Sequence, residues 1–188
     1  MRKIEKITLI GAGGTGSMIL PALVPSHDVE IYDGDVYEEK NITRQIYSAN
    51  SIGDNKAVIM AKIFNNGHKN VTAIPKMITG NEKINSDLLI CCVDNNNGRL
   101  AAQRLSDENE TPLIITGNEN WEPMAWLYLP EYKYTYNNPY KRWDLGNLKE
   151  GRQETCSGIK VIDENPQLPE ANYCAGAHAL TILYSIKT

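Results

Sequence analysis

A glycine-rich turn close to the amino terminus is the first segment of this sequence that could do chemistry. It has the pattern Gly-x-Gly-x-x-Gly, and its glycines are Gly11, Gly13, Gly14 and Gly16. Such a turn lets the backbone come close to phosphate groups, while the helix that follows offers free N–H groups and the positive end of its dipole. Asp33 lies about twenty positions further on, where a carboxylate would bind a ribose hydroxyl. These residues predict a nucleotide site, and taken alone they make NAD the default ligand.

The elements around this turn must place it at the end of a strand. Residues 6–10 are apolar and rich in β-branched side chains, which predicts a buried parallel strand that ends at the turn. A helix is expected over 14–23, shortened or kinked by Pro21, and a second strand over 28–33. Together they form a βαβ unit with a right-handed crossover. Because any tight strand-to-helix turn favours glycine, this context is what makes nucleotide binding the better interpretation.

Apolar runs and helical periods continue to alternate along the chain. They predict strands over 71–75, 87–94, 112–116 and 124–129, and helices over 55–64, 96–105 and 171–186. The near-continuous apolar run at 87–94 is typical of a strand covered on both faces, and 124–129 suits an antiparallel strand at an edge. The predicted fold is therefore α/β, a Rossmann-like, doubly wound, mainly parallel sheet with helices on both faces.

Composition divides the chain into three segments. Residues 1–130 carry the strands and the glycine turn and are expected to form a nucleotide-binding Rossmann-like domain. Residues 131–169 mix tyrosine, proline, asparagine and charged side chains without a period, which predicts a variable loop or lid. Residues 170–188 are expected to be a closing helix packed on the same domain. The aromatic side chains between Trp121 and Trp143 either line a groove for an extended peptide or form the lid's own small core.

The segment that follows Asp33 changes the expected ligand. Three motifs follow the glycine turn in order: Asp33-Gly34-Asp35, Asn41-Ile42-Thr43-Arg44-Gln45 and Gly53-Asp54-Asn55-Lys56. A later strand end carries Asp94 and Asn95, with Arg99 following. This ordered set resembles the ThiF/MoeB/ubiquitin-activating-enzyme superfamily, the ATP-dependent activators of ubiquitin-like and sulfur-carrier proteins. The resemblance covers roughly residues 6–130.

The resemblance implies an adenylyltransferase that activates a carboxylate with ATP and Mg²⁺ and works as a homodimer. Its substrate would be the C-terminal carboxylate of a small ubiquitin-like or sulfur-carrier protein. Asp33 would hold the ribose, and Asp94 would organise the magnesium ion. The residues implied at the phosphates or in the loop that surrounds them are Asp35, Asn41, Arg44, Gln45 and Lys56.

The same side chains suit this reaction without the family name. Attack by a carboxylate on the α-phosphate builds negative charge while pyrophosphate leaves, so nearby cations and a carboxylate for Mg²⁺ are needed. Arg44 can fork onto phosphate oxygens, and Lys56 supplies a compact charge. Asp94 ends a strand at the edge where open α/β sheets bind ligands. Plainer roles stay open: surface charges for Arg44 and Lys56, a helix N-cap for Asp94, and turn residues for Asn41 and Gln45.

Three features depart from the family pattern. Many members hold zinc through two Cys-x-x-Cys pairs, and this sequence contains none, so no zinc is expected. The first predicted strand begins at about residue 6, which leaves no obvious place for the amino-terminal helices that bring an arginine to the partner's ATP. Cys156 is the candidate for a thioester step, with Arg152 and Lys160 close in sequence, although an incidental cysteine is the commoner case. Cys174 is expected to pack inside the protein.

Composition excludes several classes of partner. The formal net charge is −4, so neither nucleic acid nor an anionic membrane is expected to bind. No apolar run is long enough for a transmembrane helix, and a cytoplasmic protein without a signal peptide is expected. Two alternatives to the adenylating enzyme stay open at this point. One is a non-catalytic nucleotide-binding or interaction module, and the other is an NAD-dependent oxidoreductase.

Overall fold

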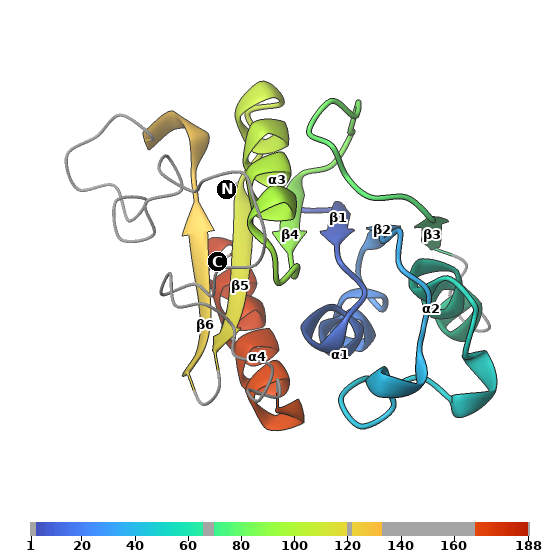
Figure 1. Cartoon of the computed structure of the whole chain (residues 1–188). Helices are drawn as coiled ribbons and strands as arrows, with labels where there is room; N and C mark the ends of the chain where they lie inside the picture. The colour runs from blue at the N-terminus through green and yellow to red at the C-terminus, as the bar shows by residue number, and fades with distance from the viewer. Residues whose placement is uncertain (1–2, 66–69, 120–121, 133–167, 188) are drawn as a thin grey trace.

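A computed structural model describes residues 3–65, 70–119, 122–132 and 168–187 of the chain. Its core is a six-stranded sheet in the order β3-β2-β1-β4-β5-β6 (Figure 1). The strands are β1 (Lys6–Ile10), β2 (Asp28–Tyr32), β3 (Val71–Ile74), β4 (Leu88–Cys91), β5 (Leu113–Glu119) and β6 (Glu122–Tyr128). The first five are parallel, and β6 pairs antiparallel with β5 at the edge. The predicted mainly parallel α/β sheet with an antiparallel edge strand is confirmed.

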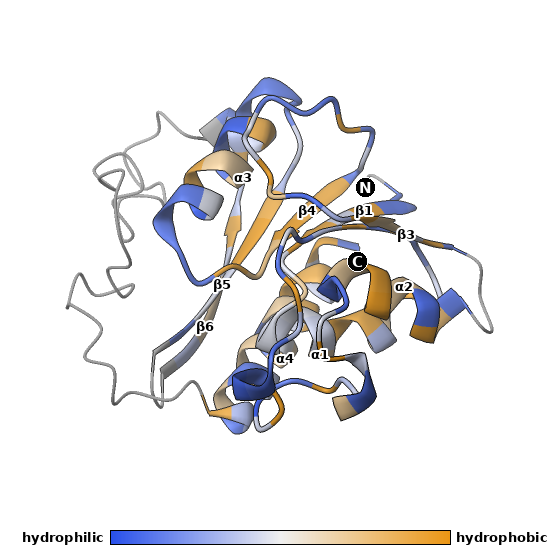
Figure 2. Cartoon of the chain, turned by 45° about the vertical axis from the view of Figure 1, so that its right-hand side comes forward, coloured by the Kyte–Doolittle hydropathy of each residue, from blue (hydrophilic) through white to orange (hydrophobic). Residues whose placement is uncertain are grey.

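Helices cover both faces of this sheet. They are α1 (Gly14–Leu23), α2 (Lys56–Asn65), α3 (Asn96–Glu108) and α4 (Pro169–Lys187). Figure 2 shows α1, α2 and α4 on one side of the sheet and α3 on the other. The side chains of β4 alternate accordingly. Leu88 and Ile90 belong to the apolar core shared with α1, α2 and α4, whereas Leu89 and Cys91 belong to the core under α3. This two-sided burial explains why β4 is apolar along its whole length.

Helix α1 continues to Leu23 although it contains Pro21. The expectation that Pro21 shortens this helix is therefore wrong. Pro21 lies on the exposed side of α1, and only the last turn follows it. Pro21 cannot donate a backbone hydrogen bond to the carbonyl four residues earlier, yet the helix continues for two more residues.

Helix α4 packs on α1, β5 and β6, far from its own position in the sequence (Figure 1). Its buried stripe is made of residues four apart: Ala171, Ala175, Ala179 and Leu183. Cys174 lies off that stripe and is exposed, so the expectation that it packs inside the protein is wrong. Close approach depends on small residues, since a Cβ on Gly176 would lie 2.6 Å from Cγ2 of Ile19.

The long connection from β2 to α2 folds into two short 3₁₀ helices, η1 (Glu39–Asn41) and η2 (Ala49–Ser51). Two buried aromatic rings hold it together. Tyr37 and Tyr47 meet edge to face with ring centroids 5.0 Å apart, and the Tyr37 hydroxyl donates to the Tyr47 carbonyl at 3.3 Å. The Tyr47 hydroxyl in turn donates to the Ala12 carbonyl in the glycine turn. The connection is therefore anchored to the turn rather than free in solvent.

Part of the predicted organisation lies outside the described residues. This applies to nearly all of the expected lid at 131–169, to Cys156, and to most of the aromatic stretch. Within β6, Tyr128 is buried and its hydroxyl donates to the Asp107 carboxylate. In the described parts of the chain, no helix has both the length and the apolar character needed to cross a membrane.

Candidate nucleotide-binding site

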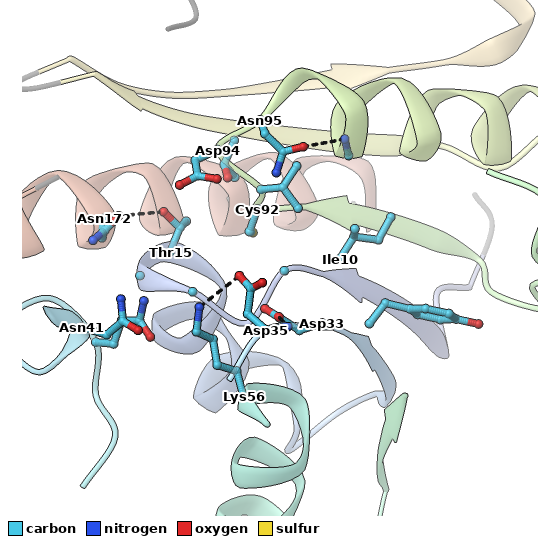
Figure 3. A pocket seen from close by; sticks show the side chains of 18 of the residues that line it. Ile10, Thr15, Asp33, Asp35, Asn41, Lys56, Cys92, Asp94, Asn95 and Asn172 are labelled. Carbon is cyan, nitrogen blue, oxygen red and sulfur yellow. Dashed lines mark hydrogen bonds and ion pairs between the residues drawn. The ribbon is translucent and has the colours of Figure 1, made fainter. Parts of the chain in front are cut away.

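A pocket of about 680 Å³ opens at the carboxyl ends of the central strands. Its walls come from the glycine turn after β1, Asp33 after β2, the segment 92–95 after β4, and Asn118 in β5. Figure 3 shows two walls facing each other: Asp33, Asp35, Lys56 and Asn41 on one, and Asp94, Asn95, Thr15 and Asn172 on the other. Strands β2, β1, β4 and β5 are neighbours in the sheet in this order, so the pocket runs along the edge formed by their carboxyl ends. This is where open α/β sheets bind their ligands.

The glycines of the turn have two different roles: Gly11 and Gly16 permit its tight backbone, and Gly13 faces the pocket. Gly11 has a φ of +94°, a conformation that favours glycine, and a Cβ on Gly16 would lie 1.9 Å from the Gly11 carbonyl oxygen. Gly13 instead lines the pocket, where a Cβ would meet only the Gln45 amide at 3.9 Å. Gly16 itself does not line the pocket; it lets α1 approach β1. Gly13 is also the N-cap of α1, and no described side chain caps the N–H groups there. The turn therefore presents an anion-binding helix end.

Asp33 is held rigidly behind the turn. One carboxylate oxygen accepts a hydrogen bond from the Ala12 N–H at 2.7 Å, and the other accepts from the Asp35 N–H at 2.8 Å. Burial raises the pKa of Asp33 above its ordinary value, although these two hydrogen bonds oppose the shift. Each oxygen keeps a second lone pair, so the carboxylate can still accept from a ribose hydroxyl.

Lys56 and Asp35 form an ion pair across the pocket wall, with 3.2 Å between Nζ and Oδ2. The Lys56 side chain is only 9% exposed, whereas that of Asp35 is 55% exposed. Asn55 supports the pair, because its amide donates to the carbonyls of Asp33 and Asp35 at 2.8 and 3.0 Å. The interpretation of Lys56 as a solvated surface charge does not fit this burial.

Arg44, Gln45 and Asn41 line the same pocket. Nε of Arg44 and Oε1 of Gln45 are buried and have no hydrogen-bond partner among the described residues. Asn41 is buried and acts as a turn residue as well. Its side chain accepts from the Glu38 N–H at 3.1 Å, and its carbonyl accepts from the N–H groups of Arg44 and Gln45. The unpartnered donor of Arg44 fits an acceptor such as a phosphate oxygen.

Asp94 lies at the end of β4, exposed and lining the pocket. It is not the N-cap of α3, which the sequence had left open as an alternative. Asn95 takes that position, and its side chain accepts from the Gly98 N–H at 2.8 Å. Asn95, rather than Asp94, is therefore the N-cap of α3.

The donor set fits Mg²⁺ in the manner typical of nucleotide sites. No group of three or more His, Cys, Asp or Glu side chains that could hold a metal exists within the described ranges. Mg²⁺, however, is usually bound through one or two carboxylates together with substrate phosphates. Asp94, facing an anion-binding helix end, meets that requirement.

Several pocket residues carry no signal in the local sequence. Thr15, Asn118 and Asn172 come together although 157 positions separate the first from the last. Cys156, the candidate for a thioester step, lies outside the described residues.

Comparison with known proteins adds one family and several similar folds. A family model described as the ThiF family matches residues 1–164. The structure of the tRNA N6-threonylcarbamoyladenosine dehydratase TcdA of E. coli is similar, with 19% identity and a TM-score of 0.66. That alignment covers 97% of this chain and 87% of TcdA. No curated protein matches the sequence.

Two larger proteins share the fold. E. coli MccB, solved with ATP, has 20% identity and a TM-score of 0.69, over 97% of this chain and 55% of MccB. PaaA has 18% identity and a TM-score of 0.69, over 97% of this chain and 55% of PaaA. The chain therefore spans just over half the length of either. At sequence identities this low, the similarity shows a shared fold only.

Proposed function

The chain belongs to the ThiF family, and from this premise we propose that it adenylates the C-terminal carboxylate of a small ubiquitin-like or sulfur-carrier protein, using ATP and Mg²⁺. ATP-dependent adenylation of a substrate is the general kind of activity that the family indicates. The carrier-protein substrate, the magnesium ion and the residue roles given below are our proposal.

The observation that carries this proposal is the convergence of the motif residues on one pocket. Asp33 and Arg44 lie between β2 and α2, Lys56 begins α2 and Asp94 follows β4, yet all four line the pocket that the glycine turn borders. In the proposed complex, Asp33 accepts from the ribose, and the glycine turn and the start of α1 bind phosphates. Asp94, together with the phosphates, would hold Mg²⁺, and the ion would supply positive charge beside the phosphates.

The proposed reaction is an in-line displacement at phosphorus. A carboxylate oxygen of the substrate forms a bond to the α-phosphorus of ATP, the bond from that phosphorus to the bridging oxygen breaks, and pyrophosphate leaves with its electron pair. The products are an acyl adenylate and pyrophosphate, and no proton is needed. Arg44 and Lys56 stabilise the charge that develops on the α-phosphate oxygens.

In the proposed complex, the Lys56 ammonium group interacts with both the Asp35 carboxylate and the ligand. Because Asp35 is the more exposed partner, its pairing keeps Lys56 extended along the pocket wall without burying a second charge. The unpartnered Nε of Arg44 offers the stronger local cation for phosphate, and Arg can bind two phosphate oxygens at once. We therefore assign Arg44 the larger effect on turnover.

A peptide or small-protein substrate is supported by one likeness. MccB structures have been solved with MccA and with AMPCPP together with MccA. TcdA has a name that points to tRNA, but the net charge of −4 on this chain does not favour nucleic acid. We also propose that the chain forms a homodimer, because its resemblance to the family implies one. Light scattering that gives a monomer at micromolar concentrations would contradict this proposal.

ATP–pyrophosphate exchange tests the function. We expect exchange when the chain is incubated with Mg²⁺, ATP and a cognate carrier protein. Asp94→Asn should lower the exchange rate by about a hundredfold or more, the scale of removing one electrostatic stabiliser of a transition state. The matched control is Asp28→Asn, because Asp28 is an exposed carboxylate at the start of β2 and outside the pocket.

Three results would point elsewhere. Binding of Mg-ATP without exchange for any carrier would favour a non-catalytic nucleotide-binding module. Tighter binding of NAD than of ATP would favour the oxidoreductase. An Asp94→Asn variant with the wild-type exchange rate would remove the role proposed for Asp94.

A further inference from the structure

The pocket includes a residue from beyond the segment that matches the family. The ThiF family model ends at residue 164, whereas helix α4 begins at Pro169. Asn172, in the first turn of α4, lines the pocket beside Thr15 (Figure 3). It is 1% exposed. The closing helix therefore contributes a polar side chain to the nucleotide site as well as covering the sheet.

The orientation of the Asn172 amide is set by two donors. Its Oδ1 accepts from the Thr15 hydroxyl at 3.1 Å and from the Asn118 amide. Because both donors need the oxygen, the amide nitrogen must point the other way. Nδ2 of Asn172 is buried and has no hydrogen-bond partner in the described residues. A buried donor left in this state is costly unless a ligand provides an acceptor.

The free Nδ2 points at the start of α1. The Cβ that a side chain on Gly14 would carry lies 2.2 Å from Nδ2, so the nitrogen faces the first residue of that helix. Helix α1 has ten residues, no acidic side chain in its first turn, and no side-chain cap from the described residues on its N-cap Gly13. The uncapped helix end and the buried amide are independent observations that both call for an anion.

We propose that Asn172 is a phosphate-binding residue of the nucleotide site. Its Nδ2–H donates to a phosphate oxygen of ATP seated at the start of α1, and Thr15 and Asn118 are positioning residues that hold the amide in that orientation. The inference rests on the proposed function, because it takes the ligand to be ATP. It assigns part of the phosphate site to a helix outside the family match.

Two substitutions separate binding from packing. Asn172→Asp is nearly isosteric and keeps an oxygen for the Thr15 and Asn118 donors, but it replaces the free N–H with a negative oxygen. Asn172→Ala removes the donor without adding a charge. The matched control is Tyr173→Ala, at an exposed position in the same turn of α4. Dissociation constants are measured by calorimetry for Mg-ATP and by competition for adenosine, which has no phosphate.

The proposal predicts that the Asn172 variants lose affinity for Mg-ATP but not for adenosine. Asn172→Asp should weaken Mg-ATP binding by at least about tenfold, the scale of losing a hydrogen bond to a charged group. Asn172→Ala should weaken it in the same direction. Adenosine affinity should stay close to wild type in both Asn172 variants, and Tyr173→Ala should leave both ligands unaffected.

Each contrary result has its own meaning. Wild-type ATP affinity in either Asn172 variant would overturn the phosphate contact alone. Equal losses for ATP and adenosine would show that Asn172 only supports the fold, which also overturns it. A wild-type chain that binds no ATP would overturn the proposed function, and this inference with it, before any variant is compared.

Discussion

Three of the six residues with a buried, unpartnered side-chain atom in the described ranges line the pocket. The atoms are Nε of Arg44, Oε1 of Gln45 and Nδ2 of Asn172. Leaving one such group unsatisfied costs about 1–3 kcal/mol. ATP offers phosphate oxygens as acceptors for the two nitrogens and ribose hydroxyls as donors for the oxygen. A bound nucleotide would therefore give all three atoms a partner, which favours a ligand-binding role for these side chains over a purely structural one.

The cysteines give a residue-scale prediction, because their environments differ sharply. Burial raises the pKa of Cys92 to about 12 and also raises the pKa of Cys91, whereas Cys174 is exposed. Only the thiolate is alkylated, so iodoacetamide at pH 8 should label Cys174 and leave Cys91 and Cys92 unmodified. Peptide mass spectrometry of the labelled, folded protein checks this.

A denatured sample provides the control for the labelling. In urea, all of these thiols should react, and labelling of Cys92 in the folded protein at the rate of Cys174 would contradict the raised pKa of Cys92. The same experiment reports on Cys156. Labelling there, followed by a Cys156→Ala variant that still exchanges pyrophosphate but forms no thioester with a carrier, would support the proposed thioester step.

At the scale of elements, the site depends on how three segments meet at the glycine turn. Helix α1 can approach β1 because Gly16 has no side chain, and the connection from β2 to α2 is tied to the turn through Tyr47 and the Ala12 carbonyl. Helix α4 reaches the same turn through Asn172. The turn thus lines the proposed ligand site and also packs against neighbouring segments. Gly13 serves the first purpose and Gly16 the second.

Gly16 and Gly13 form a matched pair that tests this division. Gly16→Ala should destabilise the fold by about 3 kcal/mol, because the new methyl would overlap the Gly11 carbonyl oxygen. Gly13→Ala should cost no more than about 1 kcal/mol, since its Cβ position is open. The same methyl would stand on the phosphate-facing surface, so Gly13→Ala should weaken ATP binding by about tenfold or more.

Denaturant unfolding and ATP titration of the two variants measure these effects. Equal stabilities would show that Gly16 is not required for the packing of α1 on β1. Unchanged ATP affinity in Gly13→Ala would show that phosphates do not sit on this face of the turn.

At the scale of the whole molecule, the pocket joins segments from both ends of the chain. Residues from β1, β2, β5 and α4, together with the segment that follows β4, line it, so a bound nucleotide would contact several strands of the folded sheet. Because such contacts exist only in the folded chain, ligand binding and global stability must be linked.

ATP should therefore raise the melting temperature of the whole chain. At a hundred times its dissociation constant, ATP adds about 2.7 kcal/mol of stability, which corresponds to a shift on the order of 5 to 10 °C for a chain of this size. Scanning fluorimetry with Mg-ATP, Mg-GTP and NAD at equal concentrations measures the shift. A larger shift with NAD than with ATP would contradict the adenylation site.

The sequence by itself determined most of the fold and the first half of the site. Each predicted strand is an apolar run of local composition. The glycine turn and Asp33 follow the first two strands directly, and Arg44 and Lys56 lie in the connection after the second strand and at the start of the next helix. In a parallel sheet, the ends of successive strands meet at one edge, so the local pattern was enough to bring these residues together. The tertiary structure then placed all of them around one pocket.

Only the tertiary structure decided the other half. Asn172 meets Thr15 because the small residues of α4 let it pack on α1, and nothing local to residue 172 encodes that contact. The same packing decided that Cys174 faces solvent, since the buried stripe of α4 passes through Ala171 and Ala175 instead. Contacts between segments so far apart follow from the fit of surfaces rather than from any period in the sequence. The glycine turn could thus be recognised from its sequence, whereas the side chain that α4 sets against it could be found only in the folded chain.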